Sequence, residues 1–492
     1  MALTRKSLPF LLALALMLIA GCAVGPNFKK PDAPNVISYI ASPLTNTETI
    51  THVTGGEAQR FVEGADISGE WWTMFHSKPL SDLVERSLKA NPNIKAAQAA
   101  LVVAREAVLA QRGAYYPSVS GGFSASRQRT SELLAPIPNA NIFTYSLYTP
   151  QVSVSYVPDV FGLNRRTVES LNAQAAQQRF ALAATYITLS ANVVSAAIQE
   201  ASLRGQIAAT HQLIDENTKA LDILRAQFAK GYASRLDLAA QESQLAQVVA
   251  TLPPLVKQLA QQRDALAVLV GGFPAQGPAE TFELSSLELP RDLPLSLPSR
   301  LVEQRPDVRQ AGENLHAASA QIGVAIANRI PNITLTASAG SSALALDQLF
   351  TSGTGFWSLG AAAAQPIFQG GMLLHKERAA KAACVQAAEQ YRNAVLTAFQ
   401  NVADTLNALE QDANALKAAV AAEHAARVTL DLTQNQLRAG YANYLTLISA
   451  ETAYQQAGLN LVQARANRFA DTAALFLALG GGWWHRADIP KS

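Results

Sequence analysis

The sequence predicts a mainly α-helical fold with a small β part. The chain contains one structural unit twice, and each copy combines very long helical patterns with two short segments of alternating apolar and polar residues. Helical patterns with heptad spacing indicate helices that pack side by side, and alternation with period two indicates strands. We therefore expect two repeats, each in the order helix, strand, strand, long helix, helix.

The repeat is visible in residue pairs that recur in the same order at a nearly constant separation. Asn91-Pro92 matches Arg305-Pro306, and Gly231-Tyr232-Ala233 matches Gly440-Tyr441-Ala442. Chance does not produce such an ordered series, so the chain is predicted to hold two copies of one unit. The expected segments are a signal (1–21), an N-terminal segment (22–90), the first repeat (91–272), a linker (273–304), the second repeat (305–481) and a tail (482–492).

The N-terminus has the pattern of a bacterial lipoprotein signal. Arg5 and Lys6 precede an apolar run that ends in small residues before Cys22. A basic start, a short apolar run and small residues at the cleavage point are typical of secretion, and the run is shorter than the about 20 residues of a membrane span. We expect a covalent lipid on Cys22, and Ala23 favours the outer membrane. The alternative is an ordinary secretory signal with an incidental cysteine.

Composition and motifs argue against an enzyme and against a nucleic-acid partner. Charged residues make up 15% of the chain, with 39 basic and 37 acidic side chains, whereas binding nucleic acid needs a basic face. The seven histidines are scattered, and no HExxH, Walker A, GxSxG or CxxC motif is present. We expect no cofactor and no metal. With Cys22 acylated, Cys384 has no cysteine left to pair with, so it is read as a helix-packing residue.

The shorter elements of each copy follow from proline positions and alternation. A first helix is predicted from Pro92 to Tyr115, stopped by Pro117. Val119 and Phe123 then alternate with serines, which predicts a strand, and a second strand returns after a loop. The four expected strands lie near 118–126, 151–156, 332–337 and 357–363. The two expected loops lie at 130–144 and 340–355.

Two very long helical patterns follow the strand pairs. From Leu163 to Lys230 the chain has no proline and a single glycine, Gly205, so a helix of about 100 Å is expected at 1.5 Å per residue. The next helix carries a leucine every seventh residue, which Pro253-Pro254 should kink or break. The second copy repeats this at 371–439 and 442–479. No segment after Cys22 is apolar over a full membrane span, so no transmembrane helix is expected.

The strands imply a membrane barrel shared between chains. An open sheet in lipid leaves backbone groups unpaired, and four strands are too few for a barrel, which needs at least about eight. At least two chains must therefore contribute. A soluble sandwich is the alternative. Aromatic residues bracket the strands as in barrel girdles: Tyr115, Tyr116, Phe161 and Phe368 at the helix side, and Phe143, Tyr145, Tyr148, Phe350, Phe356 and Trp357 at the loop side.

At this point the chain resembles the outer membrane efflux protein family, the TolC-like outer membrane factors, in its NodT-like efflux lipoprotein branch. The opening Cys22-Ala-Val-Gly-Pro, the segment with Trp71-Trp72, and the turns at 230–237 and 438–445 carry the resemblance. It implies a homotrimer with four transmembrane β-strands per chain that complete a shared β-barrel in the outer membrane, and a long coiled-coil α-barrel that extends into the periplasm.

The resemblance also implies a function, a set of partners and a gate. It indicates the outer-membrane channel of a tripartite efflux system that passes small molecules or drugs from an inner-membrane resistance-nodulation-division pump and a periplasmic adaptor to the exterior. The alternatives are an exit duct for protein secretion and a coiled-coil lipoprotein scaffold without a pore. The gate or tip residues would be Gly231, Tyr232, Asp237, Gly440, Tyr441, Tyr444 and Leu445.

The chain departs from related proteins at the second tip. Where those often carry aspartates, Thr446 and Ser449 stand here, so an acidic ring is not expected. We expect Asp237 to bond a neighbouring arginine, Arg235 or Arg438, or alternatively to act as a helix cap. Apolar packing should close the gate through Leu236, Leu238, Tyr444, Leu445 and Leu447.

The acyl group on Cys22 is predicted to be an anchor that the fold does not require. Barrel strands already hold such a protein in the membrane, and one acyl chain adds only reversible affinity. A Cys22→Ser protein with a non-lipoprotein signal should still insert and support efflux, measured as membrane-inserted trimer and drug resistance. Complete loss of inserted trimer would show that assembly needs the lipid.

Overall fold

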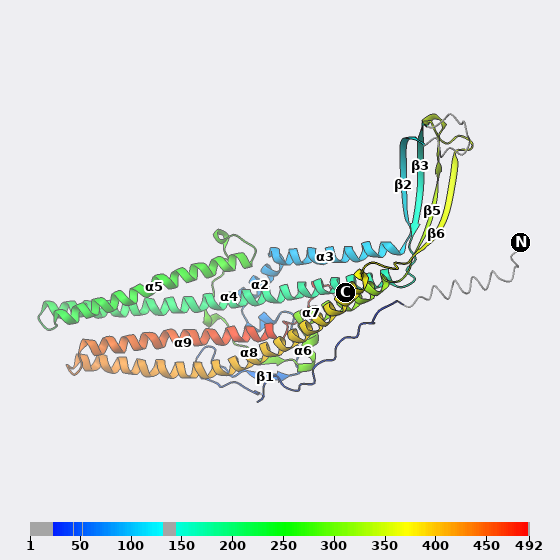
Figure 1. Ribbon diagram of the computed structural model, residues 1–492. Coiled ribbons are helices and arrows are strands. Elements are labelled where there is room, and N and C mark those ends of the chain that lie inside the picture. The colour runs from blue at the N-terminus through cyan, green and yellow to red at the C-terminus, as the bar shows by residue number, and fades with distance from the viewer. Residues whose placement is uncertain (1–22, 43, 52, 131–143, 491–492) are drawn as a thin grey trace. The chain divides into compact units, whose positions relative to one another are not determined.

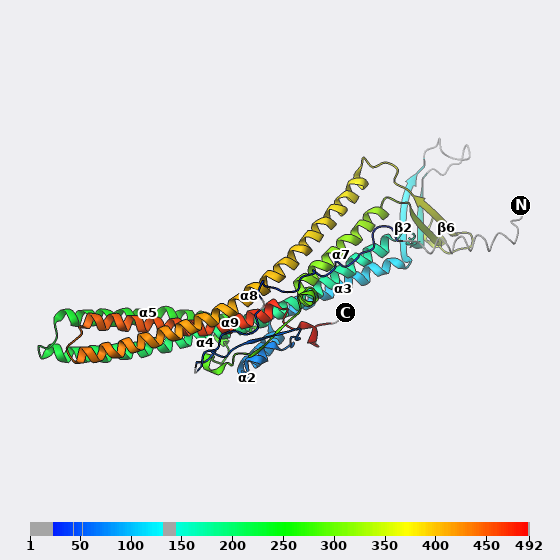
Figure 2. The ribbon, with the colours of Figure 1, turned by 90° about the horizontal axis from the view of Figure 1, so that it is seen from below.

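The computed structural model describes residues 23–42, 44–51, 53–130 and 144–490. It is 63% helix and 12% strand, as the mainly helical prediction requires. The chain forms two compact units. Unit 1 comprises the residues up to Pro31, Leu101–Gln177 and Ala311–Tyr391, and unit 2 comprises Asp32–Ala100, Gln178–Gln310 and the residues from Arg392 onward. Figures 1 and 2 show the ribbon in two views.

Unit 1 contains one antiparallel sheet of four strands in the order β2-β3-β5-β6 (Figure 1). The central pair, β3 and β5, joins the two repeats, because β3 belongs to the first copy and β5 to the second. The four expected strands are confirmed. Their bounds are Ser118–Arg129 (β2), Thr144–Tyr156 (β3), Asn332–Ser341 (β5) and Gly355–Ala364 (β6).

The strand register places apolar side chains on one face and hydroxyl side chains on the other. Val119 lies opposite Val154, which lies opposite Ala337, which lies opposite Leu359. Directly opposed residues share a face, so one set spans all four strands. The neighbouring set on the other face runs through Ser120, Ser153, Ser338 and Ser358. The expected loop at 130–144 falls largely on residues 131–143, outside the described residues.

The helices repeat with matching lengths. The two long helices each span 67 residues and the two return helices each span 35, so the expected element order is confirmed in both copies. The bounds are Pro92–Arg112 (α3), Leu163–Ala229 (α4) and Arg235–Leu269 (α5) in the first copy, and Pro306–Ala327 (α7), Met372–Arg438 (α8) and Tyr444–Ala478 (α9) in the second.

The prolines inside α5 do not break it. The helix runs without interruption through Pro253 and Pro254, so of the expected kink or break, the break is wrong. Both prolines are exposed. The carbonyl groups that lose their amide partners on that side can therefore bond to water, which lowers the usual penalty of an internal proline.

The leucine stripe of α5 is covered only in part within one chain. Leu238, Leu245 and Leu252 are half-buried, whereas the fully buried positions at this end of the helix are Gln241, Gln244 and Val248. The long helix α4 has its own exception to the heptad pattern. Glu200 is fully buried and pairs with Arg204 at 2.8 Å and with Arg263 of α5 at 2.9 Å.

The helix α4 also contains a window that is apolar enough by composition to cross a membrane, contrary to the expectation that none follows Cys22. Within the protein, 67% of that window is buried. An apolar helix that is buried by its neighbours belongs to a protein core.

Unit 2 holds elements that the sequence patterns did not predict. A short parallel pair joins β1 (Arg60–Glu63) to β4 (Asp292–Leu295). The core beside it includes Trp71 stacked on Phe476 of α9 at 5.1 Å. The remaining elements of unit 2 are α2 (Lys78–Ala90), α6 (Pro298–Gln304) and the 3₁₀ turns Trp71–Phe75, Pro274–Gln276, Leu284–Ser286 and Trp483–His485, and unit 1 has the 3₁₀ turns Gly113–Tyr115 and Leu346–Gln348.

The first described residues of unit 1 lie in a tight cradle. Arg166 is buried and donates to the carbonyl groups of Val24 at 3.0 Å and Gly25 at 3.2 Å. Gly25 has φ +94° and lies so close to Gly323 that an added Cβ would meet its Cα at 2.5 Å. Both glycines are therefore required for this approach. The cradle fixes the chain immediately after the predicted acylation position.

A second buried arginine ties the N-terminal segment of unit 2 to α9. The guanidinium of Arg468 is fully buried and donates to Gly55 O at 2.7 Å and Glu57 O at 3.1 Å. It also donates to the side chains of Thr47 and Gln59, each at 3.1 Å. These bonds hold Thr47 and residues 55–59 against the helix.

Replacing this arginine should release the segment. In Arg468→Ala, the buried carbonyl group of Gly55 and the half-buried one of Glu57 lose their donors, at about 1–3 kcal/mol for the buried group and less for the other. Limited proteolysis should then cleave within residues 45–60, and the thermal midpoint should fall. The control is Gln463→Ala, a residue of α9 that bonds only Asn467 in the described part of the chain. Equal protease resistance of the two variants would contradict the assignment.

Candidate functional site

The two helical turns expected to form the tip lie in unit 2, where α4 reverses into α5 and α8 reverses into α9. Both views place the two reversals at the same end of that unit (Figures 1 and 2). We call this end, residues 227–241 and 436–451, the tip.

Both turns share one backbone geometry. Gly231 has φ +78° and Gly440 has φ +79°. Tyr232 N donates to Gln227 O at 2.9 Å, and Tyr441 N donates to Gln436 O at 2.8 Å. A left-handed residue followed by this bond is the Schellman motif that ends helices, and glycine is the residue that adopts it without strain. The predicted role of the two glycines as helix ends is confirmed.

The residues after each turn cap the returning helices. In the first repeat Ser234 and Asp237 form a capping box, in which Asp237 N donates to Ser234 Oγ at 3.1 Å and Ser234 N donates to Asp237 Oδ2 at 3.1 Å. In the second repeat Asn443 Oδ1 accepts from Thr446 N at 2.9 Å. Asp237 makes no ion pair with Arg235 or Arg438 among the described residues. Within one chain, therefore, the capping alternative applies to Asp237.

The expected apolar closure is only partly present within one chain. Leu447 is buried with Leu430 and Ala450, and Tyr444 packs against this cluster. Leu236 is 78% exposed and Leu445 is 67% exposed, so neither packs as expected here. Their repeat neighbours Tyr232 and Tyr441 are 81% and 86% exposed. The tip therefore presents four large apolar side chains to its surroundings.

One hydrogen bond across the tip was not predicted. Tyr444 Oη donates to Gln227 Oε1 at 2.5 Å, so the start of α9 is bonded to the last turn of α4. Burial raises the pKa of Tyr444, and the nearby charge of Asp237 adds to the rise, so the phenol stays protonated as a donor. Gln227 and Gln436 occupy equivalent places in the repeat, but nothing in the sequence shows which of them faces a tyrosine.

A polar layer lies behind the tip, where α5 packs against α9. Gln241 is fully buried and donates to Asn217 Oδ1 of α4 at 3.0 Å. Gln244 donates to Thr452 Oγ1 of α9 at 3.2 Å. Glu451 of α9 lies against Gln241 and is 8% exposed. A cavity of about 620 Å³ opens beside this layer, and Tyr232, Asp237, Tyr444 and Glu451 are among its lining residues.

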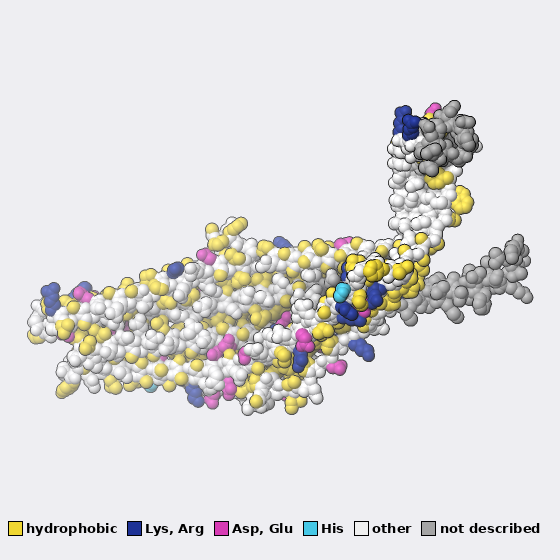
Figure 3. Space-filling view, in the orientation of Figure 1, with side chains coloured by type: hydrophobic (Ala, Val, Ile, Leu, Met, Phe, Trp, Pro, Cys, Tyr) yellow, Lys and Arg dark blue, Asp and Glu magenta, His cyan; other side chains and the backbone are white. Residues whose placement is uncertain are grey.

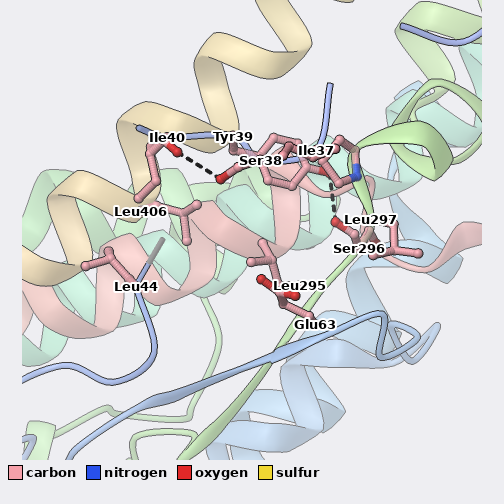
Figure 4. A pocket seen from close by; sticks show the side chains of 11 residues that line it. Ile37, Ser38, Tyr39, Ile40, Leu44, Glu63, Leu295, Ser296, Leu297 and Leu406 are labelled. Carbon is pink, nitrogen blue, oxygen red and sulfur yellow. Dashed lines mark hydrogen bonds between the residues drawn. The ribbon is translucent and has the colours of Figure 1, made fainter. Parts of the chain in front are cut away.

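The described part of the chain has two other cavities that bear on function, one in each unit. The pocket in Figure 4 measures about 30 Å³, which is room for one or two water molecules. Tyr39 Oη there donates to Ser296 O at 2.8 Å. A larger cavity of about 650 Å³ lies in unit 1 where the strands meet the helices, between Asn164, Ile330 and Gln365. Across the described ranges, no group of three His, Cys, Asp or Glu side chains could hold a metal ion. Cys22 is outside those ranges.

The comparisons with known proteins agree with this architecture. A model of the outer membrane efflux protein family matches residues 83–272 and 297–481. The toluene efflux pump outer membrane protein TtgC of Pseudomonas putida is 28% identical over 477 residues, which cover 96% of this chain and 96% of that protein.

Two further relatives bear on function and fold. The pyoverdine export outer membrane protein OpmQ, also of Pseudomonas putida, is 28% identical over 426 residues, 85% of this chain and 89% of that one. The crystal structure of the outer membrane protein VceC from Vibrio cholerae is similar with a TM-score of 0.79 at 25% identity, and the match covers 85% of this chain and 100% of that one.

The bond across the tip should help to keep the tip closed. Tyr444→Phe removes the donor to Gln227 and keeps the ring, and a bond of about 1 kcal/mol corresponds to roughly a fivefold change in an equilibrium. We expect a several-fold rise in single-channel open probability in planar bilayers. A Tyr444→Ser, Leu445→Ser double variant should open further and admit vancomycin into cells that lack the pump.

The matched control is Tyr441→Phe, because Tyr441 is exposed and its hydroxyl has no hydrogen bond among the described residues. If the double variant forms normal trimer levels and its conductance is unchanged, the gate lies elsewhere.

Proposed function

The chain belongs to the outer membrane efflux protein family, and we propose that three copies of it form one duct through that membrane. It is an outer-membrane efflux protein. In the proposed assembly, the strands of the three copies close one barrel, and the paired helices form a tube in the periplasm. Each repeat would contribute one helical hairpin to the narrow end.

The observation that carries the proposal is the pair of unpaired edges on the sheet. Within the described residues, neither β2 nor β6 pairs with another strand on its outer side. In lipid, such edges leave backbone groups without partners, at several kcal/mol each. Pairing β2 of one copy with β6 of the next satisfies both edges by the same contact, which is how a cyclic assembly closes.

The chemistry of the sheet suits this placement. Val119, Phe123, Trp357 and Leu359 are exposed on the apolar face in the single chain. Figure 3 shows a sheet surface that is almost free of charge, with basic side chains at one end. The last three residues of the strand β2 include Arg127 and Arg129. An apolar outer face with charges at its border is the arrangement of membrane barrels.

The helices give a second reason for neighbouring copies. Four leucines of the α5 stripe, Leu238, Leu245, Leu252 and Leu259, are only half-buried in one chain. Heptad stripes of this kind are normally covered by a partner helix. The four exposed apolar side chains of the tip, Tyr232, Leu236, Tyr441 and Leu445, would meet their equivalents near the threefold axis or the hairpins of an adaptor.

The proposed cargo is small molecules or drugs. Relatives are named for toluene and for antibiotic efflux, and another for pyoverdine export. No nucleotide-binding motif is present in the sequence, so the energy would come from an inner-membrane resistance-nodulation-division pump that a periplasmic adaptor joins to the tip.

The lipid anchor is part of the same proposal. Cys22 would carry the acyl chains, and the Arg166 cradle holds residues 24 and 25 firmly just after it. Because residues 24 and 25 are held in this way, the acyl chains would lie beside the barrel.

The segments at 130–144 and 340–355 would be extracellular loops, because the other strand ends continue into the periplasmic helices.

Cysteine cross-linking tests the shared barrel. A cysteine at Ser120 of β2 should join a cysteine placed in turn at Ser358, Gly360 or Ala362 of β6, all on one face of the sheet, and oxidation should give covalent dimers and trimers. The matched control pairs Ser153 with Ser338, which lie opposite each other inside one sheet. That control should cross-link within one chain. Monomers from every β2–β6 pair would overturn the assembly.

A deletion strain identifies the cargo. Loss of the protein should lower resistance to apolar antibiotics, dyes or solvents, and restoring the gene should recover it. If the strain keeps its resistance to the whole panel and instead fails to release a secreted protein, the cargo assignment is wrong.

A further inference from the structure

One glutamate position differs between the two repeats in burial and in its charge partner. Glu242 of α5 and Glu451 of α9 occupy equivalent positions. Glu242 is exposed and pairs with Arg225 of α4 at 3.3 Å. The residue of α8 that is equivalent to Arg225 is Gln434, which has no charge. Glu451 has therefore lost the cation that its counterpart keeps, and it is 8% exposed.

Glu451 instead lies against the first repeat through Gln241. Gln241 is fixed in orientation, because its amide nitrogen donates to Asn217 Oδ1 at 3.0 Å and Asn217 Nδ2 donates to Leu213 O at 3.0 Å. This chain of bonds leaves Gln241 Oε1 buried without a donor, and Glu451 Oε2 is also buried without a partner. Both are acceptor atoms unless the carboxyl group holds a proton.

No cation compensates a charge on Glu451. The charged groups that share its cavity are Glu216 and Lys219 of α4, Asp237 of α5 and Arg438 of α8. Lys219 pairs with Asp215, and Asp237 caps α5. None of them forms an ion pair with Glu451 in the described part of the chain. A buried carboxylate with neither a cation nor enough donors is unfavourable.

We propose that Glu451 is a proton-operated joint between the two hairpins: protonated, it holds α5 against α9, and on losing the proton it releases them and widens the tip. The bond from Gln241 serves only part of the buried carboxylate, and a proton supplies a donor for the acceptor atoms that remain, Glu451 Oε2 and Gln241 Oε1, so the packed arrangement binds it. The inference rests on the proposed function in taking the tip as the gate. Its ligand is the proton itself.

The direction of the pH dependence follows from linkage. Burial raises the pKa of Glu451 from its ordinary 4.5 to about 7; the bond from Gln241 opposes the rise and the charge of Glu216 adds to it. In a separated tip the carboxyl group regains water and its ordinary pKa. The stabilisation of the packed tip is therefore complete below the ordinary pKa, and it is lost as the pH rises through the raised pKa.

Single-channel recording of the full-length trimer tests this at about pH 5 and about pH 8. We expect the open probability of the native protein to rise at least about tenfold over this range, since one unit of pKa difference is tenfold in an equilibrium. Glu451→Gln cannot lose a proton and can donate to Gln241, so it should keep the low open probability at both values. Glu242→Gln is the matched control and should follow the native protein.

A second readout separates the joint from the gate. Cysteines at Gln244 and Thr452, whose side chains are 3.2 Å apart across α5 and α9, report the contact through their disulfide yield. The yield should fall at high pH relative to the same pair with Glu451→Gln, which corrects for the greater reactivity of thiolates.

The outcomes are distinguishable. A native protein in which neither the open probability nor the disulfide yield depends on pH, or a Glu451→Gln protein that opens at high pH like the native one, overturns the joint. If the disulfide yield depends on pH through Glu451 but the conductance does not, the joint stands and the tip as gate is overturned.

Discussion

Most of the architecture depends on one constraint, which is that a β-sheet in lipid cannot keep unpaired edges. The strands β2 and β6 each present one such edge. One chain offers too few strands to close on itself, and the free edges are complementary only between copies. In the proposed cyclic assembly, the internal repeat of each chain would double the symmetry of the helical part. The long helices would share this arrangement, because each strand pair continues along the chain into one helical hairpin.

The elements that the sequence could predict are those with a local sequence pattern. The two 67-residue helices were predictable because no proline interrupts either pattern, and the strands because hydroxyl side chains alternate with apolar ones. The pairing of β1 with β4 could not be predicted from the sequence, because four-residue strands that meet over a long sequence separation leave no local pattern. The break expected at the prolines of α5 does not occur. The sequence alone does not show this, because the effect of an internal proline depends on its exposure, which is set by tertiary packing.

The tip shows where sequence reasoning stops. Helix ends at Gly231 and Gly440 are local, and glycine spacing reveals them. The bond between Tyr444 and Gln227 and the contact between Glu451 and Gln241 join different hairpins. A repeat shows which positions correspond, but it does not show which copy of a position turns toward the other. The one signal in the sequence is that the second repeat has the uncharged Gln434 where the first has Arg225. This difference is informative only once the structure shows the buried carboxyl group of Glu451.

The hydroxyl face of the sheet has a consequence for permeation. In the register, Ser120, Ser153, Ser338 and Ser358 form one row, and the adjoining positions on that face are also serine, threonine, glutamine, alanine or glycine along most of its length. If this face lines the duct, the lumen within the membrane carries almost no fixed charge. Such a wall exchanges hydrogen bonds with water and gives little preference to anions or cations. Ion selectivity would then arise elsewhere along the path, while uncharged solutes would pass the barrel without a site that retains them.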